Sequence, residues 1–308
     1  MNTRAALSIV LSLLILLPSS FAEANHSAEV ECGKYTRYDR ELIENGGKVI
    51  STVFPWHVLI YLKKRDMTYI QICGGSLIRN NLVVSAAHCF YDEDSRHVKN
   101  ASSFVVAAGK RYRAWDADQQ YSQKSLVESI EVKDRYLGLA GNFIMDIALL
   151  KLNTPFELNM LVHPICIDWE RENLYERDPL QSQLSKMVSW SKIIKDESNQ
   201  RRIIKDESNQ TLHEIDMPYV TYMQCKAESP RDVHRFLTVD KFCAGRLNDS
   251  STCNGDGGSG LYIKKGEVWY LRGIASVKFG AFDECNSYSG FTNINFFYDW
   301  IRKAYDSA

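Results

Sequence analysis

Three segments of the chain carry side chains that together could perform acyl transfer. His88 follows a strand-like run, and Asp146 opens another apolar run, Asp146–Leu150. An imidazole can take the proton of a nucleophile, and a buried carboxylate can fix the tautomer of that imidazole and stabilise its charged form. The third segment, Cys253–Leu261, reads CNGDGGSGL and is rich in turn-forming glycine. A lone histidine among seven is usually structural, so the order His, Asp, glycine-rich turn is what points to a catalytic site.

Short strands must position these segments. The runs Val58–Leu62, Phe104–Ala108 and Val268–Leu271 are rich in β-branched or aromatic residues and are bounded by turn residues. The clearest helical spacing lies in Phe296–Tyr305, close to the C-terminus. Many short strands followed by one terminal helix predict an all-β protein built as a barrel or a sandwich.

The charge balance argues against two classes of partner. The 308 residues include 37 basic and 38 acidic side chains, for a net charge of −1. Such a chain lacks the basic excess that nucleic-acid binding or polybasic membrane contact requires. With 45% hydrophobic residues it can form a core, which excludes disorder as a global description. We expect no cofactor and no metal, and we expect a monomer that acts on or binds polypeptides.

The N-terminus predicts secretion. Arg4 precedes the apolar run Ala5–Leu17, and small residues follow at Ala22 and Ala24. This pattern is typical of a signal peptide, and the run is too short to cross a membrane. We therefore expect a signal peptide over 1–22, a short segment over 23–42 that contains Cys32, and one domain over 43–308. Four glycosylation sequons fit an extracellular glycoprotein, at Asn25, Asn100, Asn209 and Asn248. Eight cysteines allow four disulfides in an oxidising compartment, with 105 possible pairings.

Several motifs make the chain resemble the chymotrypsin-like serine proteases (the trypsin family) over 43–308. They are Phe54-Pro55-Trp56, Cys73–Ile78 (CGGSLI), Ala86–Cys89 (AAHC), Asp146–Leu150 (DIALL), His163–Ile167 (HPICI), Gly273-Ile274 and Trp300-Ile301. The chain is most similar to the protease domain of insect modular serine proteases, which start haemolymph immune cascades. The resemblance implies two packed six-stranded antiparallel β-barrels with a C-terminal helix. It places the active site between the two barrels.

The resemblance also implies one pairing of the cysteines. The implied pairs are Cys73–Cys89, Cys225–Cys243, Cys253–Cys285 and Cys32–Cys166. The last pair would tether the segment over 23–42 to the main domain. This pairing uses all eight cysteines.

The chain departs from the family at the nucleophile. The family motif reads GDSGGP, and the same frame over Gly255–Gly260 reads GDGGSG, so Gly257 occupies the nucleophile position. Glycine has no hydroxyl and cannot form an acyl-enzyme. The resemblance assigns the general base and its orienting acid to His88 and Asp146, and the backbone N–H groups of Gly255 and Gly257 to an oxyanion hole. Ser259 stands two residues beyond the vacated position, too far along the turn to substitute without rearrangement.

Activation in the family requires a cleavage that frees an apolar N-terminus. The matching residue here is Ile43, and its α-amino group would pair with Asp256. Leu42 precedes it where the family has arginine or lysine, so cleavage needs a leucine-directed activator. Glu44 replaces an apolar residue, and its burial without a partner would be unfavourable. Activation is either altered or lost.

The expected specificity pocket is neutral. Counting back from Gly257 places Ser251 at its floor, and Ser276 and Lys278 lie at its wall. A neutral floor favours an apolar or aromatic substrate side chain over a basic one, as in chymotrypsin.

A duplicated octapeptide interrupts the second half. IIKDESNQ occurs over 193–200 and again over 203–210, with Arg201-Arg202 between the copies. We interpret it as a duplication within a solvated loop, where insertions are tolerated. The arginine pair is a candidate proteolytic site.

These residues support three alternative hypotheses of function. The first is a secreted, non-catalytic serine protease homologue that regulates an extracellular, innate-immune protease cascade. The second is an active serine-type endopeptidase of the same fold, acting through Ser259 or a rearranged loop, with a neutral, chymotrypsin-like preference for the substrate side chain. The third is a protein that binds carbohydrate or microbial surfaces, although the sequence has no aromatic stripe to mark such a face.

Overall fold

The structure is a computed structural model of the chain. It describes residues 31–34, 54–117, 122–170, 185–189, 212–247, 252, 255–279 and 287–308, together with the backbone of four short strands within 41–50 and 193–203. By its contacts the chain divides into Met1–Val30 and Glu31–Ala308, and every described residue belongs to the second unit.

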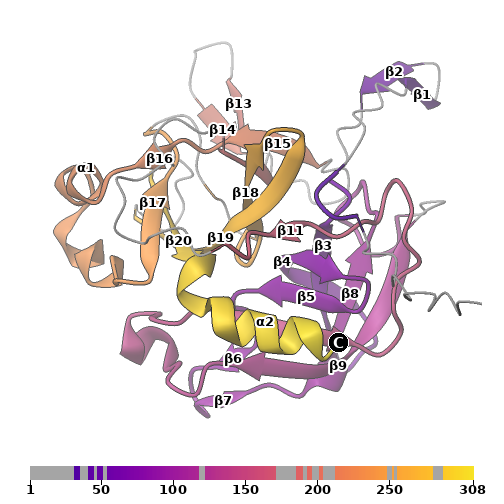
Figure 1. The fold of residues 1–308 in the computed structure, drawn as a ribbon, viewed down its shortest axis with the longest axis horizontal. Coiled ribbons are helices and arrows are strands. Elements are labelled where there is room, and N and C mark those ends of the chain that lie inside the picture. Colours follow the sequence, from indigo (N-terminus) through magenta and orange to yellow (C-terminus); the bar gives the residue numbers. More distant parts are fainter. Residues whose placement is uncertain are drawn as a thin grey trace, which may run out of the picture. The chain divides into compact units, whose positions relative to one another are not determined.

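The first half of this unit is a closed six-stranded barrel (Figure 1). Its strands are β3 (His57–Lys63), β4 (Tyr69–Arg79), β5 (Leu82–Ser85), β8 (Phe104–Ala108), β9 (Gln123–Val132) and β10 (Ala148–Leu152). They pair antiparallel in the order β10-β5-β4-β3-β8-β9. Val58, Ile60 and Val106 belong to the buried hydrophobic core, as the β-branched composition of these runs predicts.

The second half is an eight-stranded sheet. Its strands are β11 (Cys166–Ile167), β12 (Ser185–Ser189), β15 (His213–Asp216), β16 (Tyr219–Val220), β17 (Lys241–Ala244), β18 (Gly260–Lys265), β19 (Val268–Lys278) and β20 (Ser289–Asn293). Seven run in the order β15-β12-β18-β19-β20-β17-β16, and β11 pairs with β19. The two outermost strands follow each other in the chain, with only Met217 and Pro218 between them. The chain itself therefore joins the two ends of the sheet.

These findings confirm the mostly β, chymotrypsin-like fold with a C-terminal helix, with one difference. The second barrel is not a closed ladder of six strands. Its expected sixth strand is divided into β15 and β16 at Met217-Pro218, where the proline has no N–H to donate.

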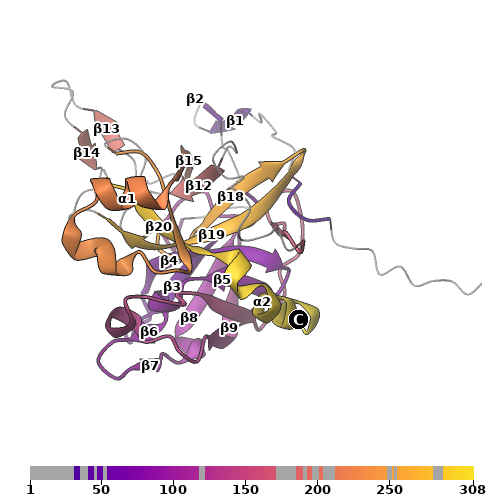
Figure 2. The ribbon, with the colours of Figure 1, turned by 60° about the vertical axis from the view of Figure 1, so that its left-hand side comes forward.

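The C-terminal helix is shorter at its start than the sequence predicts. Residues Ile294–Phe297 form a 3₁₀ turn, and α2 extends over Tyr298–Asp306. Ile301 of α2 is fully buried in the main hydrophobic core, and Arg302 pairs with Asp306 one turn later. Figure 2 shows α2 beside the strands of the first barrel.

Several smaller elements complete the fold, and most had no clear sequence signal. They are β1 (Glu41–Glu44), β2 (Gly47–Ile50), β6 (Tyr91–Asp92), β7 (His97–Val98), α1 (Tyr222–Glu228) and the 3₁₀ turns Ala87–Cys89, Ala101–Ser103, Gly138–Gly141 and Arg231–Phe236. Thr221 caps α1 by accepting a hydrogen bond from the backbone N–H of Gln224.

The duplicated octapeptide contributes to a hairpin where the sequence analysis expected a loop. Strand β13 (Ile193–Lys195) begins the first copy, and β14 (Arg201–Ile203) contains both arginines and the first residue of the second copy. The two strands pair antiparallel, with Ile193 opposite Ile203. Isoleucine favours strands, and the duplication places one on each strand, opposite each other, at the end of the hairpin away from its turn. Residues 196–200 and 204–210 lie outside the described residues.

Among the described residues there are three disulfide bonds, and each joins a pair that the resemblance implies. They are Cys32–Cys166, Cys73–Cys89 and Cys225–Cys243, while Cys253 and Cys285 lie outside the described residues. Next to the first disulfide, the N–H of Gly33 donates to Pro164 and its carbonyl accepts from Trp269. A Cβ at Gly33 would lie 2.1 Å from the carbonyl oxygen of Trp269, so only glycine fits this close approach.

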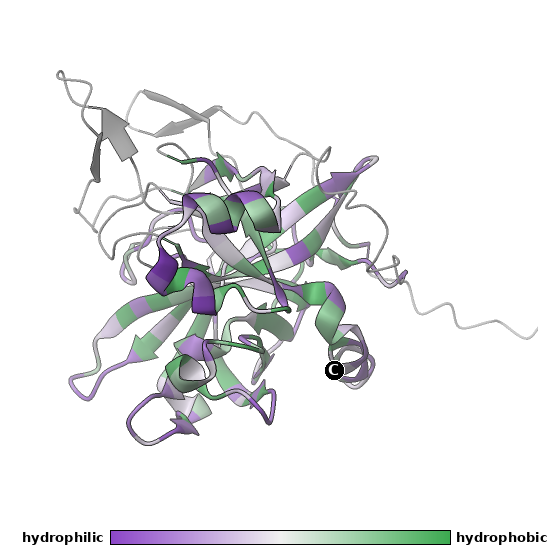
Figure 3. Cartoon of the chain, turned by 90° about the vertical axis from the view of Figure 1, so that its left-hand side faces the viewer, coloured by the Kyte–Doolittle hydropathy of each residue, from purple (hydrophilic) through white to green (hydrophobic). Residues whose placement is uncertain are grey.

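Hydrophobic residues concentrate along the strands of the first barrel, and hydrophilic residues occupy the turns between them (Figure 3). Within the described part of the chain, every helix is too short or too polar to cross a bilayer.

One histidine of the first barrel is buried. His57 begins β3 and is 5% exposed. Among the described residues, neither of its ring nitrogens has a hydrogen-bond partner. Burial lowers the pKa of His57 from 6.5 to about 3, because the charged ring would lose its hydration.

This burial predicts a specific sensitivity to acid. Between pH 6.5 and 3 the unfolded chain binds a proton at His57 that the folded chain does not, so the free energy of unfolding falls as pH decreases. The slope from this group approaches about 1.4 kcal/mol per pH unit. The free energy of unfolding is measured by urea denaturation from pH 7 to 4. In His57→Leu the part of its pH dependence that comes from His57 should be absent. His97→Leu, at an exposed position, is the control. Equal slopes in the parent and His57→Leu would contradict the assignment.

Candidate active site

His88 is held by the first barrel at two points. It lies in the 3₁₀ turn Ala87–Cys89, directly after β5. The next residue, Cys89, forms a disulfide with Cys73 of β4, so the turn is covalently attached to the barrel wall. The imidazole is 26% exposed, which leaves it accessible while its backbone is fixed.

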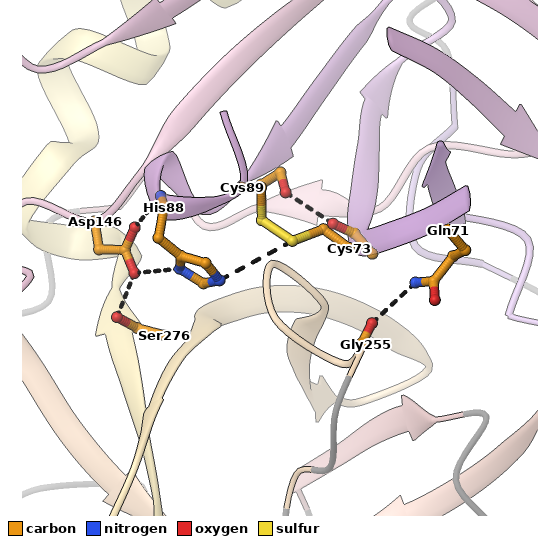
Figure 4. The surroundings of a disulfide bond; sticks show 9 residues. Gln71, Cys73, His88, Cys89, Asp146, Gly255 and Ser276 are labelled. Atoms are coloured by element: carbon orange, nitrogen blue, oxygen red, sulfur yellow. Dashed lines mark hydrogen bonds and ion pairs between the residues drawn. A yellow bond between two sulfur atoms is a disulfide. The ribbon is translucent and has the colours of Figure 1, made fainter. Parts of the chain in front are cut away.

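Asp146 orients this imidazole from the start of the segment that leads into β10. Its carboxylate is fully buried. Oδ1 accepts the backbone N–H of His88 at 2.8 Å, and Oδ2 lies 2.8 Å from His88 Nδ1 (Figure 4). Ser276 of β19 donates a third hydrogen bond to Oδ2, at 2.5 Å. With Nδ1–H directed at the carboxylate, Nε2 is the basic nitrogen of the neutral ring.

The two groups stabilise each other in their charged forms. Burial alone would lower the pKa of His88, but the charge of Asp146 and the hydrogen bond to it outweigh burial and raise that pKa above 6.5. Burial alone would raise the pKa of Asp146, and the contacts with His88, helped by the Lys241 charge and the Ser276 hydroxyl, lower it below 3.8. The carboxylate is therefore ionised at neutral pH.

The glycine-rich turn brings Gly257 against His88. A Cβ at Gly257 would lie 2.6 Å from Nε2 of His88 and 3.7 Å from Sγ of Cys73. The carbonyl of Gly257 accepts the N–H of Gly74 at 2.9 Å, and Gly258 N–H donates to Ala275 at 2.8 Å. The turn is thus bonded to β4 of the barrel and to β19 of the second sheet. A side chain at Gly257 would point directly at the basic nitrogen of His88.

Ser259 is directed elsewhere. It is 2% exposed, and its Oγ would lie 2.2 Å from a Cβ placed on Gly74. The hydroxyl therefore packs against the backbone of β4. Its own N–H donates to Asp256 at 3.0 Å, which closes the turn.

The peptide before this turn is held by a side chain of the barrel. Gln71 of β4 donates through Nε2 to the carbonyl of Gly255 at 2.9 Å (Figure 4). Arg113 in turn donates through Nε to Oε1 of Gln71 at 2.8 Å. Gly255 has φ +94°, a conformation that side chains rarely adopt, and a Cβ there would lie 2.6 Å from the Arg113 guanidinium.

The remaining predicted site residues are only partly brought together. Ile43 lies within β1, opposite Lys48 of β2, and Asp256 is buried within the turn. Ser276, predicted as a pocket wall, contacts Asp146, and Lys278 ends β19. Ser251 lies outside the described residues. Asn100 is exposed, and its side chain accepts hydrogen bonds from Ser102; the other three sequons are also outside the described residues.

Sequence reasoning missed a strained segment beside the histidine. Asn142, Phe143 and Met145 all have positive φ, between 53° and 63°. The N–H of Met145 donates to the buried carboxylate of Asp240, and Nζ of Lys241 donates to the carbonyl of Phe143. Backbone strain of this kind persists only where surrounding contacts hold it. Here it sets the Phe143 ring 6.3 Å from the ring of His88, in edge contact.

One group among the described residues has the spacing of a metal site, but its sulfur atoms are not available as ligands. Cys73, His88 and Cys89 cluster within 4.8 Å, but both sulfurs belong to the disulfide and are not thiolates.

The family model for trypsin matches residues 43–301. The chain is similar to a modular serine protease of Drosophila melanogaster, with 30% identity over 290 residues that cover 90% of this chain and 42% of the relative. It is also similar to Limulus clotting factor C of Carcinoscorpius rotundicauda, with 30% identity over 88% of this chain and 26% of that protein. Rat chymotrypsin-C is 29% identical over 85% of this chain and 88% of its own length.

The chain thus spans less than half the length of the first two relatives.

The site geometry predicts how His88 responds to loss of its partner. In Asp146→Asn the negative charge that raises the pKa of His88 is gone, while the burial that lowers it remains. The pKa of His88 should therefore fall below 6.5, as measured by titration of its ring protons by NMR. Ser276→Ala removes only one hydrogen bond to the carboxylate and should shift the same pKa much less. An unchanged pKa in Asp146→Asn would show that the carboxylate does not control the imidazole.

Proposed function

Because the chain belongs to the trypsin family of serine proteases, we propose that it is a secreted, non-catalytic member of that family. Membership in a protease family implies polypeptide substrates or protein partners. In this proposal the chain binds a protease, an inhibitor or a substrate polypeptide and regulates an extracellular cascade of innate immunity. The similarity to proteins named as a modular serine protease and a clotting factor supports a cascade role.

One observation carries the non-catalytic part of the proposal. The residue whose Cβ would face the basic nitrogen of His88 is Gly257, at 2.6 Å. A hydroxyl-bearing side chain at this position would be the nucleophile that the imidazole activates. Glycine offers no such atom. The oriented pair His88 and Asp146 therefore has no nucleophile from the turn to act on.

The rest of the site supports polypeptide binding. The turn keeps its backbone bonds to β4 and β19, so its N–H groups remain in a defined conformation. The imidazole keeps its charged orienting partner and its exposure. A surface that is ordered before binding loses little conformational entropy when a partner polypeptide binds to it. Such a site can hold a polypeptide without cleaving it.

The position of Ser259 weighs against the alternative of an active endopeptidase. Its buried hydroxyl packs on Gly74, whereas the residue that faces His88 is Gly257. A catalytic role would require the turn to break its bonds to Gly74 and Ala275. Errors of about 1 Å in such geometry already reduce rates by about 10²-fold.

A covalent probe tests the proposal. Residues 38–42 are replaced by Asp-Asp-Asp-Asp-Lys, so that enteropeptidase frees Ile43, and the cleaved protein is incubated with a fluorophosphonate. The parent should remain unlabelled, because no nucleophile faces His88. Labelling of the parent that disappears in Ser259→Ala would overturn the non-catalytic assignment.

The same cleaved protein supports a gain-of-function test. Gly257→Ser should become labelled, at a rate at least about 10³-fold above the parent. The new Cβ requires His88 to move by several tenths of an ångström, so labelling should be slower than in an ordinary family member. In Gly257→Ser combined with His88→Ala, labelling should be lost. Labelling that persists there would mean that the imidazole does not activate the introduced serine.

Secretion has its own test at Asn100. This asparagine is exposed, as glycosylation requires, and it heads the Asn-Ala-Ser sequon. Protein secreted from insect cells should lose mass on treatment with peptide N-glycosidase F. The mass loss should be smaller in Asn100→Gln than in the parent. Ser102→Ala should show the same smaller mass loss as Asn100→Gln. If Asn100→Gln leaves the mass loss unchanged, the sequon is not used.

A further inference from the structure

A loop of the first barrel builds a continuous surface of aromatic and basic side chains. Residues 109–117 fold back over β4, where the ring of Trp115 stacks on Tyr69 at 3.8 Å between centroids. Nζ of Lys124 lies 3.7 Å above the Trp115 ring. Lys63 is the register partner of Tyr69 on β3. These contacts bring the β3–β4 turn, the loop and the start of β9 together.

The surface is strongly basic. We define the basic face as the six cations of these three segments that are not buried: Lys63, Lys64, Arg65, Arg111, Arg113 and Lys124. The described residues of the same segments include only two carboxylates, Asp66 and Asp116. The whole chain carries a net charge of −1, so this local excess is a departure from the average. Concentrated charge of one sign attracts an oppositely charged partner.

An exposed apolar side chain interrupts the basic face. Met67 is 61% exposed and lies in the β3–β4 turn. Purely ionic contacts in water contribute little and weaken with salt, whereas apolar contacts contribute through burial. A partner that uses both would carry acidic and apolar side chains together, which is the chemistry of a polypeptide.

The loop is fixed before any partner arrives. Lys110 is 6% exposed, and its Nζ donates to the backbone carbonyls of Ala114, at 2.7 Å, and Trp115, at 3.3 Å. The hydroxyl of Tyr61 donates to the carbonyl of Arg113 at 2.7 Å. A loop held in this way does not need to be ordered on binding, which favours affinity.

The basic face also adjoins the candidate active site. Arg113 contacts Gln71, and Gln71 holds the carbonyl of Gly255, two residues before Gly257. A polypeptide that lies at His88 and Gly257 would therefore reach the basic face within a few residues.

We propose that the basic face docks an acidic segment, containing apolar residues, of the polypeptide that this protein binds. The docking itself follows from the charges and apolar side chains of the surface. That the docked segment belongs to the chain held at His88 rests on the proposed function. The partner is thereby specified as a protein with an acidic stretch next to its site-binding segment.

Charge reversal on the basic face tests the docking. The probe is a fluorescein-labelled dodecapeptide of ten glutamates and two phenylalanines, titrated by fluorescence anisotropy at low ionic strength. The variant Lys64→Glu/Arg65→Glu/Lys124→Glu should bind it at least about tenfold more weakly. The control Lys226→Glu/Arg231→Glu/Arg235→Glu makes the same charge change at exposed positions of α1 and the 3₁₀ turn after it, and should bind within about twofold of the parent.

Several outcomes would overturn the docking proposal. Equal losses in the two triple variants would mean that only net charge matters, and absence of saturable binding to the parent would mean that there is no docking site. Tight binding of heparin to the same residues, with no binding of the peptide, would assign the surface to a sulfated polysaccharide. Near-UV circular dichroism of each variant confirms that it is folded.

A second measurement separates the docking from the proposed function. The peptide should change the fluorescence of Trp115, and Trp115→Phe should remove that change, because Trp115 lies within the surface. Neither readout depends on catalysis. Fluorophosphonate labelling of the parent would overturn the non-catalytic function and leave the docking proposal intact. Failure of the peptide to bind would overturn the docking proposal and leave the non-catalytic function intact.

Discussion

The buried carboxylate of Asp146 is the contact on which the site depends. It sits at the start of the segment leading into β10 of the barrel and accepts hydrogen bonds from His88 on the barrel and Ser276 on the second sheet. Its own backbone carbonyl accepts the hydroxyl of Thr292 from β20. An unpaired carboxylate at this depth would be very unfavourable, and both halves of the molecule supply its partners. Satisfying this one charge therefore aligns the barrel and the sheet.

Close backbone approach is the second constraint at this junction. The turn containing Gly257 bonds to Gly74 of β4 and to Ala275 of β19 through main-chain groups alone. Such contacts survive the loss of a side chain. This explains how the structure can keep the conformation of a protease turn although the position facing His88 is glycine. The constraint on the backbone and the requirement for a nucleophile are physically independent.

Much of the fold was predictable because its signals are local. Apolar runs rich in β-branched residues marked β3 and β8, and apolar spacing marked α2, although its first turn is 3₁₀. The divided edge strand at Pro218 and the hairpin formed by the duplicated octapeptide were not predicted. Both depend on which strands become neighbours, and that choice is made by packing between segments distant in the chain. Short 3₁₀ turns were missed because they have little periodicity to detect.

The sequence by itself determined the identity of the site residues: the order of His88, Asp146 and the glycine-rich turn, the family they indicate, and the glycine at position 257. Only the tertiary structure decided how these residues meet. It directed the Ser276 hydroxyl to Asp146 across 130 residues, set Ser259 against Gly74, and tied Gly255 to Gln71 and Arg113. The reason is physical. Residue type sets which bonds a group can form, whereas burial and three-dimensional proximity select the bonds that do form.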